Sequence, residues 1–344
     1  MSHSFFAFVQ QLGETPALAL FTLLTLGVLL VNGWTDAPNA IAGAVVTGAL
    51  PFRRAVILAA VCNFAGVCCV TAVNASVAET VYSIAAFSGG PRAASIALSA
   101  GMAGVVIWAV VCWRWGIPTS ESHALVAGIT GAAVALEGSW SCVHWESWGK
   151  VLLGLLLSTA AGFWCGRQMG RWAGTWKGSD RLFCCLQLPG AAATAFFHGA
   201  QDGQKFLGVF LLGTALVQGR QDEQTFVVPL WLLVFCAVGM ALGTGMGGRR
   251  IIDTVGREMV TLNPRDGVAC DLAGVGCLLV ATVMGLPVST THTRTAALLG
   301  VGCAGGKKAD WRVAGTIALA WGLTFPGCAV LGWSMARLFL HIWQ

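Results

Sequence analysis

Long stretches of apolar residues recur along the whole chain, and short segments that carry most of the charge separate them. Several of these stretches approach the roughly 20 residues that a helix needs to cross a bilayer. A transmembrane barrel would instead show short segments of alternating polarity. The pattern therefore predicts membrane helices. The apolar stretches lie at residues 17–31, 55–73, 96–113, 124–136, 151–165, 206–217, 226–242, 272–286 and 313–336.

When they are extended to their polar boundaries, these nine stretches, together with the segment 288–304, predict about ten membrane segments. Segments 118–136 and 288–304 are short, and we interpret them either as crossings or as re-entrant hairpins. Hydrophobic residues make up 56% of the chain and charged residues only 10%, whereas a soluble domain carries about 25% charged residues. We therefore expect an all-α polytopic membrane protein. The predicted segments are 17–50, 55–76, 95–113, 118–136, 149–166, 185–217, 226–246, 267–286, 288–304 and 313–337.

The basic residues are distributed unequally between the two sets of alternating loops. Fourteen of the 20 lysines and arginines lie in one set, and four lie on the opposite side, at Arg92, Lys150, Arg220 and Arg337. Because cytoplasmic loops are enriched in Lys and Arg, we expect a multi-pass protein of the inner (plasma) membrane whose two termini face outward. This charge lies in short loops, so we expect no nucleic-acid partner. The basic loops are 51–54, 114–117, 167–184, 247–266 and 305–312.

Two different motifs each occur twice in the chain, in the same order. "NGWTDAPNAIAG" at 32–43 parallels "HGAQDGQKFLG" at 198–208, and Asp36 aligns with Asp202 at an offset of 166 residues. "GIPTSESHALVAGITGAAV" at 116–134 parallels "GLPVSTTHTRTAALLGVG" at 285–302, at an offset of 169 residues. An internal duplication explains both. Five predicted segments per half make the halves inverted, at residues 1–178 and 179–344, an arrangement common in secondary transporters.

The first motif places a carboxylate within a glycine-rich interruption of an apolar helix. Asp36 and Asn39 are three residues apart, which puts them on one face of any helical turn that they share. A carboxylate at membrane depth costs at least a few kcal/mol unless it is paired. A polar pair that holds two helices together would satisfy this requirement. The repetition of the motif at Asp202 instead favours a cation or substrate site.

In the second motif a proline ends an apolar run and several hydroxyls follow it. These hydroxyls include Ser120 and Ser122 in the first copy and Ser289, Thr290 and Thr291 in the second. Proline followed by Ser or Thr is also an ordinary helix start. However, the free N–H groups of a helix N-terminus, together with hydroxyls, bind anions. Two such ends that face each other would hold a tetrahedral oxyanion from both sides.

The stretches "GWTDAPNA", "IPTSESH", "GAQDGQK" and "LPVSTTH" resemble the repeated motifs of the PiT-type inorganic phosphate transporters, a family that includes sulfate permeases. The resemblance extends from about residue 20 to residue 335. It implies inverted repeats with broken helices, ion-coupled phosphate uptake, and a homodimer as in many members. The short segment that joins the two halves is typical of bacterial members. Carried over by position, the resemblance places substrate and ion sites at Asp36, Asn39, Ser120, Ser122, Asp202, Ser289 and Thr291.

The chain departs from the motifs of this family at several positions. Thr35 and Gln201 replace the first asparagine of each copy, and Lys205 replaces the second asparagine of the second copy. A tethered ammonium can occupy the place of a sodium ion, although an ion pair with Asp202 is an alternative role. Glu121 replaces the hydroxyl or neutral residue that is usual in the family, and Arg294 has no charged equivalent in the first copy. An ion pair that satisfies both is the alternative to a functional role.

The two histidines that follow the hydroxyls, His123 and His292, have two possible roles. They can hydrogen-bond the backbone of a broken helix, or they can contact substrate and relay protons. The ion-coupling set that we predict combines Asp36, Asn39, Asp202, Glu121, Thr35, Gln201, His123 and His292.

These observations predict a secondary active transporter that imports inorganic phosphate, without enzymatic activity or a cofactor. The substrate contacts that we predict are Ser120, Ser122, Ser289, Thr290, Thr291, Asp36, Asp202 and Lys205. The alternatives are a sulfate permease on the same fold and an anion channel. Phosphate is favoured over sulfate because a carboxylate in the site can accept the proton that phosphate carries.

The coupling ion is H⁺ or Na⁺. Sodium would bind at Asp36 and Asn39, through oxygen ligands of the broken helix. The ammonium of Lys205 beside Asp202 favours protons, because it repels a second sodium ion.

Overall fold

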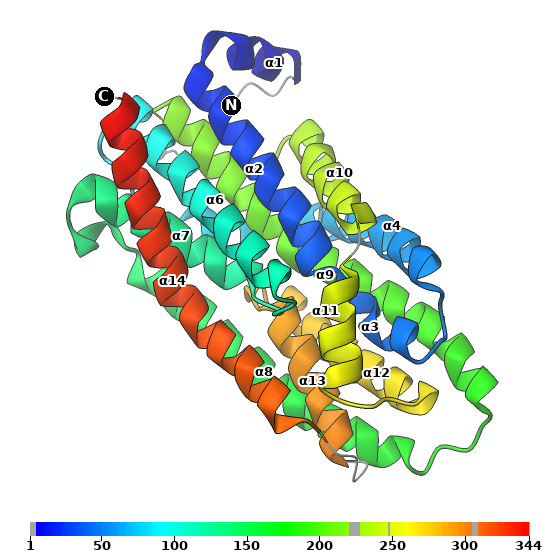
Figure 1. The fold of residues 1–344 in the computed structure, drawn as a ribbon. Coiled ribbons are helices and arrows are strands. Elements are labelled where there is room, and N and C mark those ends of the chain that lie inside the picture. Colours follow the sequence, from blue (N-terminus) through cyan, green and yellow to red (C-terminus); the bar gives the residue numbers. More distant parts are fainter. Residues whose placement is uncertain (1–4, 220–227, 247, 305–308, 344) are drawn as a thin grey trace.

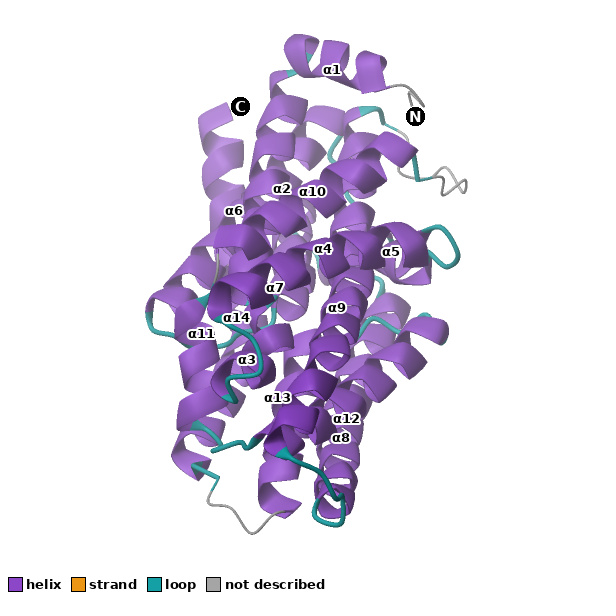
Figure 2. Cartoon of the chain, turned by 90° about the vertical axis from the view of Figure 1, so that its right-hand side faces the viewer, coloured by secondary structure: helices purple, strands orange, loops and turns teal. Residues whose placement is uncertain are grey.

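A computed structural model describes residues 5–219, 228–246, 248–304 and 309–343, and these residues form helices without a β-strand. Most of the helices are long and run roughly side by side (Figure 1). The first helix, α1, lies at one end of the molecule (Figure 2). The helices are α1 Phe5–Glu14, α2 Pro16–Thr35, α3 Pro38–Val46, α4 Phe52–Thr71, α5 Ser76–Tyr82, α6 Pro91–Arg114, α7 Glu121–Glu137, η1 Trp140–Cys142, α8 Trp145–Ala173, α9 Asp180–Val217, α10 Leu230–Met246, α11 Arg249–Asp253, η2 Thr254–Glu258, α12 Pro264–Val283, α13 Thr290–Ala304 and α14 Trp311–Trp343.

Seven helices of the described part are long and apolar enough to cross a membrane, or eight if the bent α10–α11/η2 pair counts as one span. The all-α polytopic fold is thereby confirmed, and about ten segments was an approximate count. The difference comes from α7, α10 and α13, which have 17, 17 and 15 residues. The predicted segments 118–136 and 288–304 correspond to α7 and α13, which are shorter than the helices counted as spans. The start of the predicted segment 226–246 lies partly outside the described residues.

The two copies of the first motif differ in backbone structure. The chain breaks at Asp36–Ala37, between α2 and α3, whereas α9 continues as one helix through Asp202. The reason lies in the aligned residues, since Pro38 corresponds to Gln204 in the second copy. Proline lacks an N–H and its ring clashes with the preceding turn of a helix. Only the first motif therefore forms the broken helix that we predicted for both.

Helices of one half pack against helices of the other half in exchanged pairs, so that each contact has a counterpart in which the two halves trade places. Helix α4 packs against α9 and α10 against α2, while α7 packs against α14 and α13 against α8. Aligned glycines allow the closest approaches: a Cβ atom on Gly33 would lie 2.4 Å from the backbone nitrogen of Thr244, and one on Gly199 would lie 2.2 Å from the carbonyl oxygen of Asn63. The fold thus consists of two inverted repeats that interlock along their length. We propose that they divide between residues 178 and 179.

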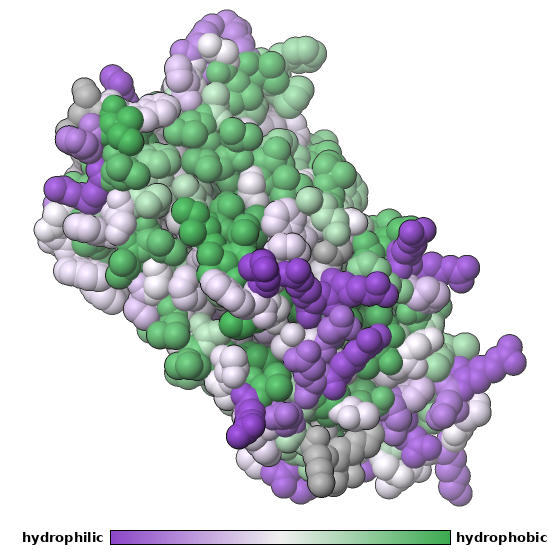
Figure 3. Space-filling view, viewed as in Figure 1, coloured by the Kyte–Doolittle hydropathy of each residue, from purple (hydrophilic) through white to green (hydrophobic). Residues whose placement is uncertain are grey.

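The two ends of the molecule differ in hydropathy on the face that Figure 3 shows. The N- and C-terminal helices end together, away from α3 and α11–α13 (Figure 1). Hydrophilic side chains gather around the opposite end, and an apolar surface covers much of the length between (Figure 3). This apolar surface faces lipid in a membrane protein. Three of the basic residues in the loop comparison, Arg220, Lys307 and Lys308, lie outside the described residues.

Candidate functional site

The polar residues of both motifs meet at a single place inside the protein. It lies where the break between α2 and α3, the middle of α9 and the first turns of α7 and α13 come together. Each predicted site side chain there is 8% exposed or less. The site is therefore closed toward both ends of the molecule. Its predicted residues are Thr35, Asp36, Asn39, Ser120, Glu121, Ser122, His123, Gln201, Asp202, Lys205, Ser289, Thr290, Thr291 and His292.

The N-termini of α7 and α13 face each other across this site. Gly116 and Gly285 turn the chain just before each helix with φ angles of +68° and +65°, which glycine adopts without strain. The extended residue Ser120 precedes α7, and its hydroxyl makes no capping bond to that helix. It instead accepts a hydrogen bond from the Ser289 hydroxyl at 2.9 Å. The structure thus brings the two hydroxyl clusters into direct contact, as the duplicated motif predicted.

Lys205 uses all three of its donors within the site. Its Nζ atom lies 2.6 Å from each of three acceptors: the Ser122 hydroxyl, the Asp202 Oδ1 atom and the Val288 carbonyl oxygen. A fully buried ammonium is stable only when it is paired and hydrogen-bonded in this way. The ion pair with Asp202 that we considered is therefore present. Through Ser122, Lys205 also joins the second repeat to the hydroxyls of the first.

The second oxygen of Asp202 is equally occupied. Its Oδ2 atom accepts hydrogen bonds from Asn32 at 3.3 Å and from the Thr290 hydroxyl at 3.2 Å. The His198 Nε2 atom lies 3.3 Å from the same oxygen. Asp202 is thus the most highly connected side chain of the site, and it ties α2, α9 and α13 together.

The first copy is less crowded around its carboxylate. The Asn39 side-chain amide donates to Asp36 Oδ1 at 3.2 Å and to the Thr291 hydroxyl at 3.3 Å. Ligand atoms of Asp36, His198 and Asp202 all lie within 4.8 Å of one another. Two carboxylates this close repel each other unless a cation or proton lies between them. The arrangement can therefore hold a positive charge between the two repeats.

Glu121 and Gln201 have different surroundings. The Thr35 hydroxyl donates to Glu121 Oε1 at 3.2 Å, and among the described residues Glu121 Oε2 has no hydrogen-bond partner. Gln201 turns away from the carboxylates: it donates to Thr282 and to the Leu286 carbonyl, and it accepts from the backbone nitrogen of Val288. It thereby supports the turn before α13. Glu121 and Gln201 both stay predictions for ion coupling, although the contacts of Gln201 lie with α12 and the turn before α13.

The two histidines of the hydroxyl motif contact aromatic rings. Their rings lie 4.6 Å apart, edge to face, while His123 stacks on Phe325 and His292 on Trp321. In the described part of the chain, His123 Nδ1 and His292 Nε2 make no hydrogen bond. The aromatic contacts explain why these residues sit in the wall of the site.

Arg294 does not pair with Glu121. Its Nη2 atom lies 2.7 Å from Asp271 Oδ1, and its Nη1 atom donates to the Cys270 carbonyl oxygen at 3.0 Å. Asp271 belongs to α12, which packs directly on α13. The alternative that joined Glu121 with Arg294 is therefore wrong.

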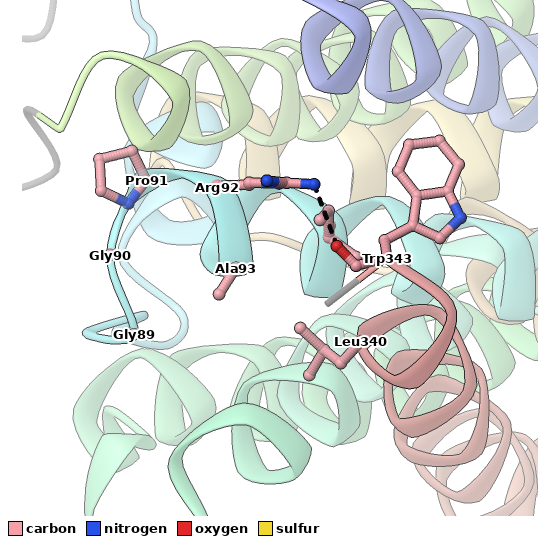
Figure 4. Close-up of a pocket in the computed structure, with 8 residues that line it drawn as sticks. Gly89, Gly90, Pro91, Arg92, Ala93, Leu340 and Trp343 are labelled. Atoms are coloured by element: carbon pink, nitrogen blue, oxygen red, sulfur yellow. Dashed lines mark hydrogen bonds between the residues drawn. The ribbon is translucent and has the colours of Figure 1, made fainter.

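A surface pocket at the end where the termini lie is separate from this site. Gly89, Pro91, Arg92, Leu340 and Trp343 are among its lining residues, and Arg92 donates to the Trp343 carbonyl oxygen at 3.1 Å (Figure 4). None of the residues predicted for substrate or ion binding lines it.

Comparison with known proteins gives a family. The sequence profile described as the phosphate transporter family matches the chain twice, at residues 32–176 and 167–332. The chain belongs to this family. The two matches together cover most of the length over which the motif resemblance extends.

Relatives of this family member carry matching names. It is 33% identical over 321 residues to a probable low-affinity inorganic phosphate transporter of Bacillus subtilis. The match covers 91% of this chain and 94% of the relative. It is 35% identical over 329 residues to a protein of the same name from Mycobacterium bovis, covering 92% and 77% of the two chains. A solved structure titled the sodium-dependent phosphate transporter shares the fold, with a TM-score of 0.82, 20% identity, and 96% and 100% of the two chains covered.

Sequence reasoning missed two polar residues of this family member's site. Asn32 and His198 both contact Asp202, and His198 Nδ1 lies 3.0 Å from the side-chain oxygen of Asn63 on α4. The signal was present, because Asn32 and His198 are aligned at the same offset of 166 residues as the two aspartates. Each stands one helical turn before its aspartate, on the same face.

Proposed function

We propose that this protein imports inorganic phosphate as an ion-coupled secondary transporter. The observation that carries this proposal is the buried cluster of polar motif residues (called the polar chamber below) in which the N-termini of α7 and α13 face each other, with Ser120 and Ser289 in contact and Lys205 beside them. Hydroxyl donors, helix N-termini and a fixed ammonium are the groups that bind a phosphate oxyanion. The names of the relatives support the same substrate.

The charges of the chamber support coupling to cations. Three buried carboxylates, Asp36, Glu121 and Asp202, face one buried ammonium, Lys205. With all four ionised, the formal charge is −2, and phosphate adds one or two negative charges to it. At short range in a poorly solvated interior this repulsion is large. Positive charge that enters with phosphate would relieve this repulsion, which favours coupled transport over simple anion permeation.

We propose protons as the coupling cation. Lys205 holds a fixed positive charge 2.6 Å from Asp202, at the position where the family motif has an asparagine. This ammonium repels a metal cation from the second copy, while Asp36 and Glu121 stay available to accept protons. The alternative is sodium at Asp36 and Asn39, because the Asn39 side-chain oxygen is buried and has no hydrogen-bond partner among the described residues.

A second candidate substrate is a neutral complex of phosphate with a divalent cation. The observation that favours it is the convergence of Asp36, His198 and Asp202, whose ligand atoms lie within 4.8 Å of one another. Two carboxylates and one imidazole suit a divalent transition metal. In this case the metal ion is cargo and supplies the positive charge that the chamber lacks.

The decisive experiment is uptake of labelled phosphate into proteoliposomes. We expect accumulation above the outside concentration, stimulated by an inward proton gradient and abolished by a protonophore. Excess unlabelled phosphate should compete, whereas sulfate should compete weakly, because sulfate carries no proton for a carboxylate to accept at neutral pH. Equal competition by sulfate would instead identify a sulfate permease. Uptake that needs added Mn²⁺ or Zn²⁺ would identify the metal complex as substrate.

Lys205→Asn tests the choice of coupling ion, since it restores the family residue. We expect this variant to gain dependence on sodium while it keeps phosphate transport. Lys150→Asn is the control, because Lys150 is exposed and pairs with the exposed Glu146 on its own helix. If wild-type uptake collapses when choline replaces sodium and a proton gradient gives no stimulation, the proton proposal is wrong.

The family and the basic loops also bear on where the protein lies and how it assembles. We propose the bacterial plasma membrane, with the basic loops in the cytoplasm, and a homodimer. The mass of the protein in native-like lipid discs distinguishes a dimer from a monomer.

A further inference from the structure

A buried ion pair joins α12 to α13 outside the contacts of the polar chamber. Arg294 on α13 and Asp271 on α12 are 2.7 Å apart, and their side chains are 4% and 3% exposed. The guanidinium holds two consecutive residues of α12 at once, the Cys270 carbonyl oxygen with Nη1 and the Asp271 carboxylate with Nη2. This two-point contact fixes the side of α13 that faces α12.

The first repeat has apolar residues at the corresponding positions. Gly116 and Gly285, which turn the chain before α7 and α13, set the alignment at an offset of 169 residues. At this offset Asp271 corresponds to Met102 and Arg294 to Leu125, and both of these apolar side chains are buried. The hairpin of α6 and α7 (the first hairpin) therefore has hydrophobic packing where the hairpin of α12 and α13 (the second hairpin) has an ion pair.

Glycines of the second repeat make room for this ion pair. A Cβ atom on Gly274 would lie 2.7 Å from the Cδ and Nη1 atoms of Arg294, and one on Gly190 of α9 would lie 2.6 Å from Asp271 Oδ2. At the corresponding position of the first repeat, Gly274 is replaced by the buried Val105. The two hairpins thus differ at the neighbours of the ion pair as well as at the pair itself.

Stability alone does not explain the pair. Within the described part of the chain, Arg294 Nε and Asp271 Oδ2 have no hydrogen-bond partner, although both are buried. Replacing a buried ion pair by apolar residues of similar size is often neutral or stabilising, because both charges lose their hydration on burial. The first hairpin shows that this same fold accepts apolar residues here.

The position of the Arg294–Asp271 ion pair relative to the Thr290 and Thr291 hydroxyls indicates what the pair does. Arg294 follows Thr290 by four residues and Thr291 by three, so all three lie on one side of α13. Thr290 contacts Asp202 and Thr291 contacts Asn39. We propose that the Arg294–Asp271 pair is a positioning latch, which fixes the rotation of α13 about its axis and so aims these two hydroxyls into the chamber. Apolar packing is not directional, and the first hairpin has no such latch. The inference rests on the proposed function only in treating the hydroxyls as phosphate ligands.

The test replaces the pair by the residues of the first hairpin. Arg294→Leu alone leaves Asp271 buried without a partner, and we expect it to fold poorly. The double variant D271M/R294L removes both charges and should fold. Amide hydrogen exchange is measured across residues 290–298 of α13, with residues 121–129 of α7 as the internal control, and KM and Vmax for phosphate are measured in proteoliposomes. Met102→Leu, a size-conserving change in the first hairpin, is the matched control variant.

We expect exchange in α13 of the double variant to become about tenfold faster, while exchange in α7 stays unchanged. We expect KM to rise about fivefold, the effect of one weakened hydrogen bond, with a smaller change in Vmax. Unchanged exchange together with unchanged KM would overturn the proposal, and so would faster exchange with unchanged KM. If the wild type takes up no phosphate under any gradient, the proposed function fails, whereas the exchange measurement still decides whether the pair holds α13.

Discussion

At the residue scale, the hydroxyl pair between the repeats is the most direct contact to test. We expect Ser120→Ala and Ser289→Ala each to raise the KM for phosphate about fivefold, since a lost hydrogen bond costs about 1 kcal/mol. The double variant should show less than the product of the two effects, because the hydroxyls bond to each other at 2.9 Å. Initial uptake rates over a range of phosphate concentrations measure both.

Ser99→Ala is the matched control for the hydroxyl variants. Ser99 is buried as deeply, but among the described residues its hydroxyl bonds to the Ser95 carbonyl oxygen of its own helix alone. Equal KM values for wild type, Ser120→Ala and Ser289→Ala would contradict the anion site.

The carboxylate of Asp36 is the second residue to test. We expect Asp36→Asn to abolish accumulation of phosphate while expression stays intact, because the amide can accept neither a proton nor a metal cation as the carboxylate does. Accumulation is measured at steady state under an inward gradient, and Asp310→Asn, at an exposed helix start, is the control. Near-normal accumulation in Asp36→Asn would show that the carboxylate is only structural.

Sequence reasoning found most residues of the chamber because they repeat. A duplicated polar motif in an apolar chain is visible without a structure, and it identified Asp36, Asp202 and both hydroxyl clusters. The partner of Arg294 was not visible, because Asp271 has no polar counterpart in the first repeat and is isolated in an apolar helix. Contacts between helices that differ from one repeat to the other need coordinates.

At the scale of elements, aligned glycines decide how closely the exchanged helices pack. We expect Gly199→Ala to destabilise the protein by about 1–3 kcal/mol, because its Cβ atom would lie 2.2 Å from the backbone of α4, which cannot move aside as a side chain does. Thermal unfolding in detergent measures the change. Gly276→Ala is the control, because a Cβ atom there meets nothing within 4 Å. A similar unfolding temperature for both variants would contradict the close packing of α4 on α9.

The backbone of α9 also shows where element prediction failed. The glycines around Asp202 predicted a break like the one at Asp36, but glycine only permits a break, whereas proline removes a helical hydrogen bond. With Gln204 at the position of Pro38, the helical bonds continue. The lengths of the apolar stretches likewise predicted which long helices span the membrane. They did not predict whether α7 and α13 cross it, because the placement of a short helix depends on the helices around it.

At the scale of the whole molecule, the repeats make the site a shared property of both halves. Helices α8 and α14 each pack against the short helix of the opposite repeat, α13 and α7 respectively. Neither half therefore completes the chamber alone. The order of the motifs predicted this arrangement, because two inverted halves place their equivalent segments around one axis.

The net charge of the chamber also determines which step of the transport cycle the membrane voltage drives. With all four groups ionised after phosphate and its cations leave on the inside, three carboxylates and one ammonium remain, and the unloaded chamber returns outward with a formal charge of −2. A negative-inside potential drives this return, at about 2.3 kcal/mol per charge and 100 mV for a full crossing. We therefore expect net uptake to accelerate with voltage. Exchange of labelled for unlabelled phosphate does not include the return of the empty chamber, so its rate should depend little on voltage. An exchange rate that rises with voltage as steeply as net uptake would contradict this expectation.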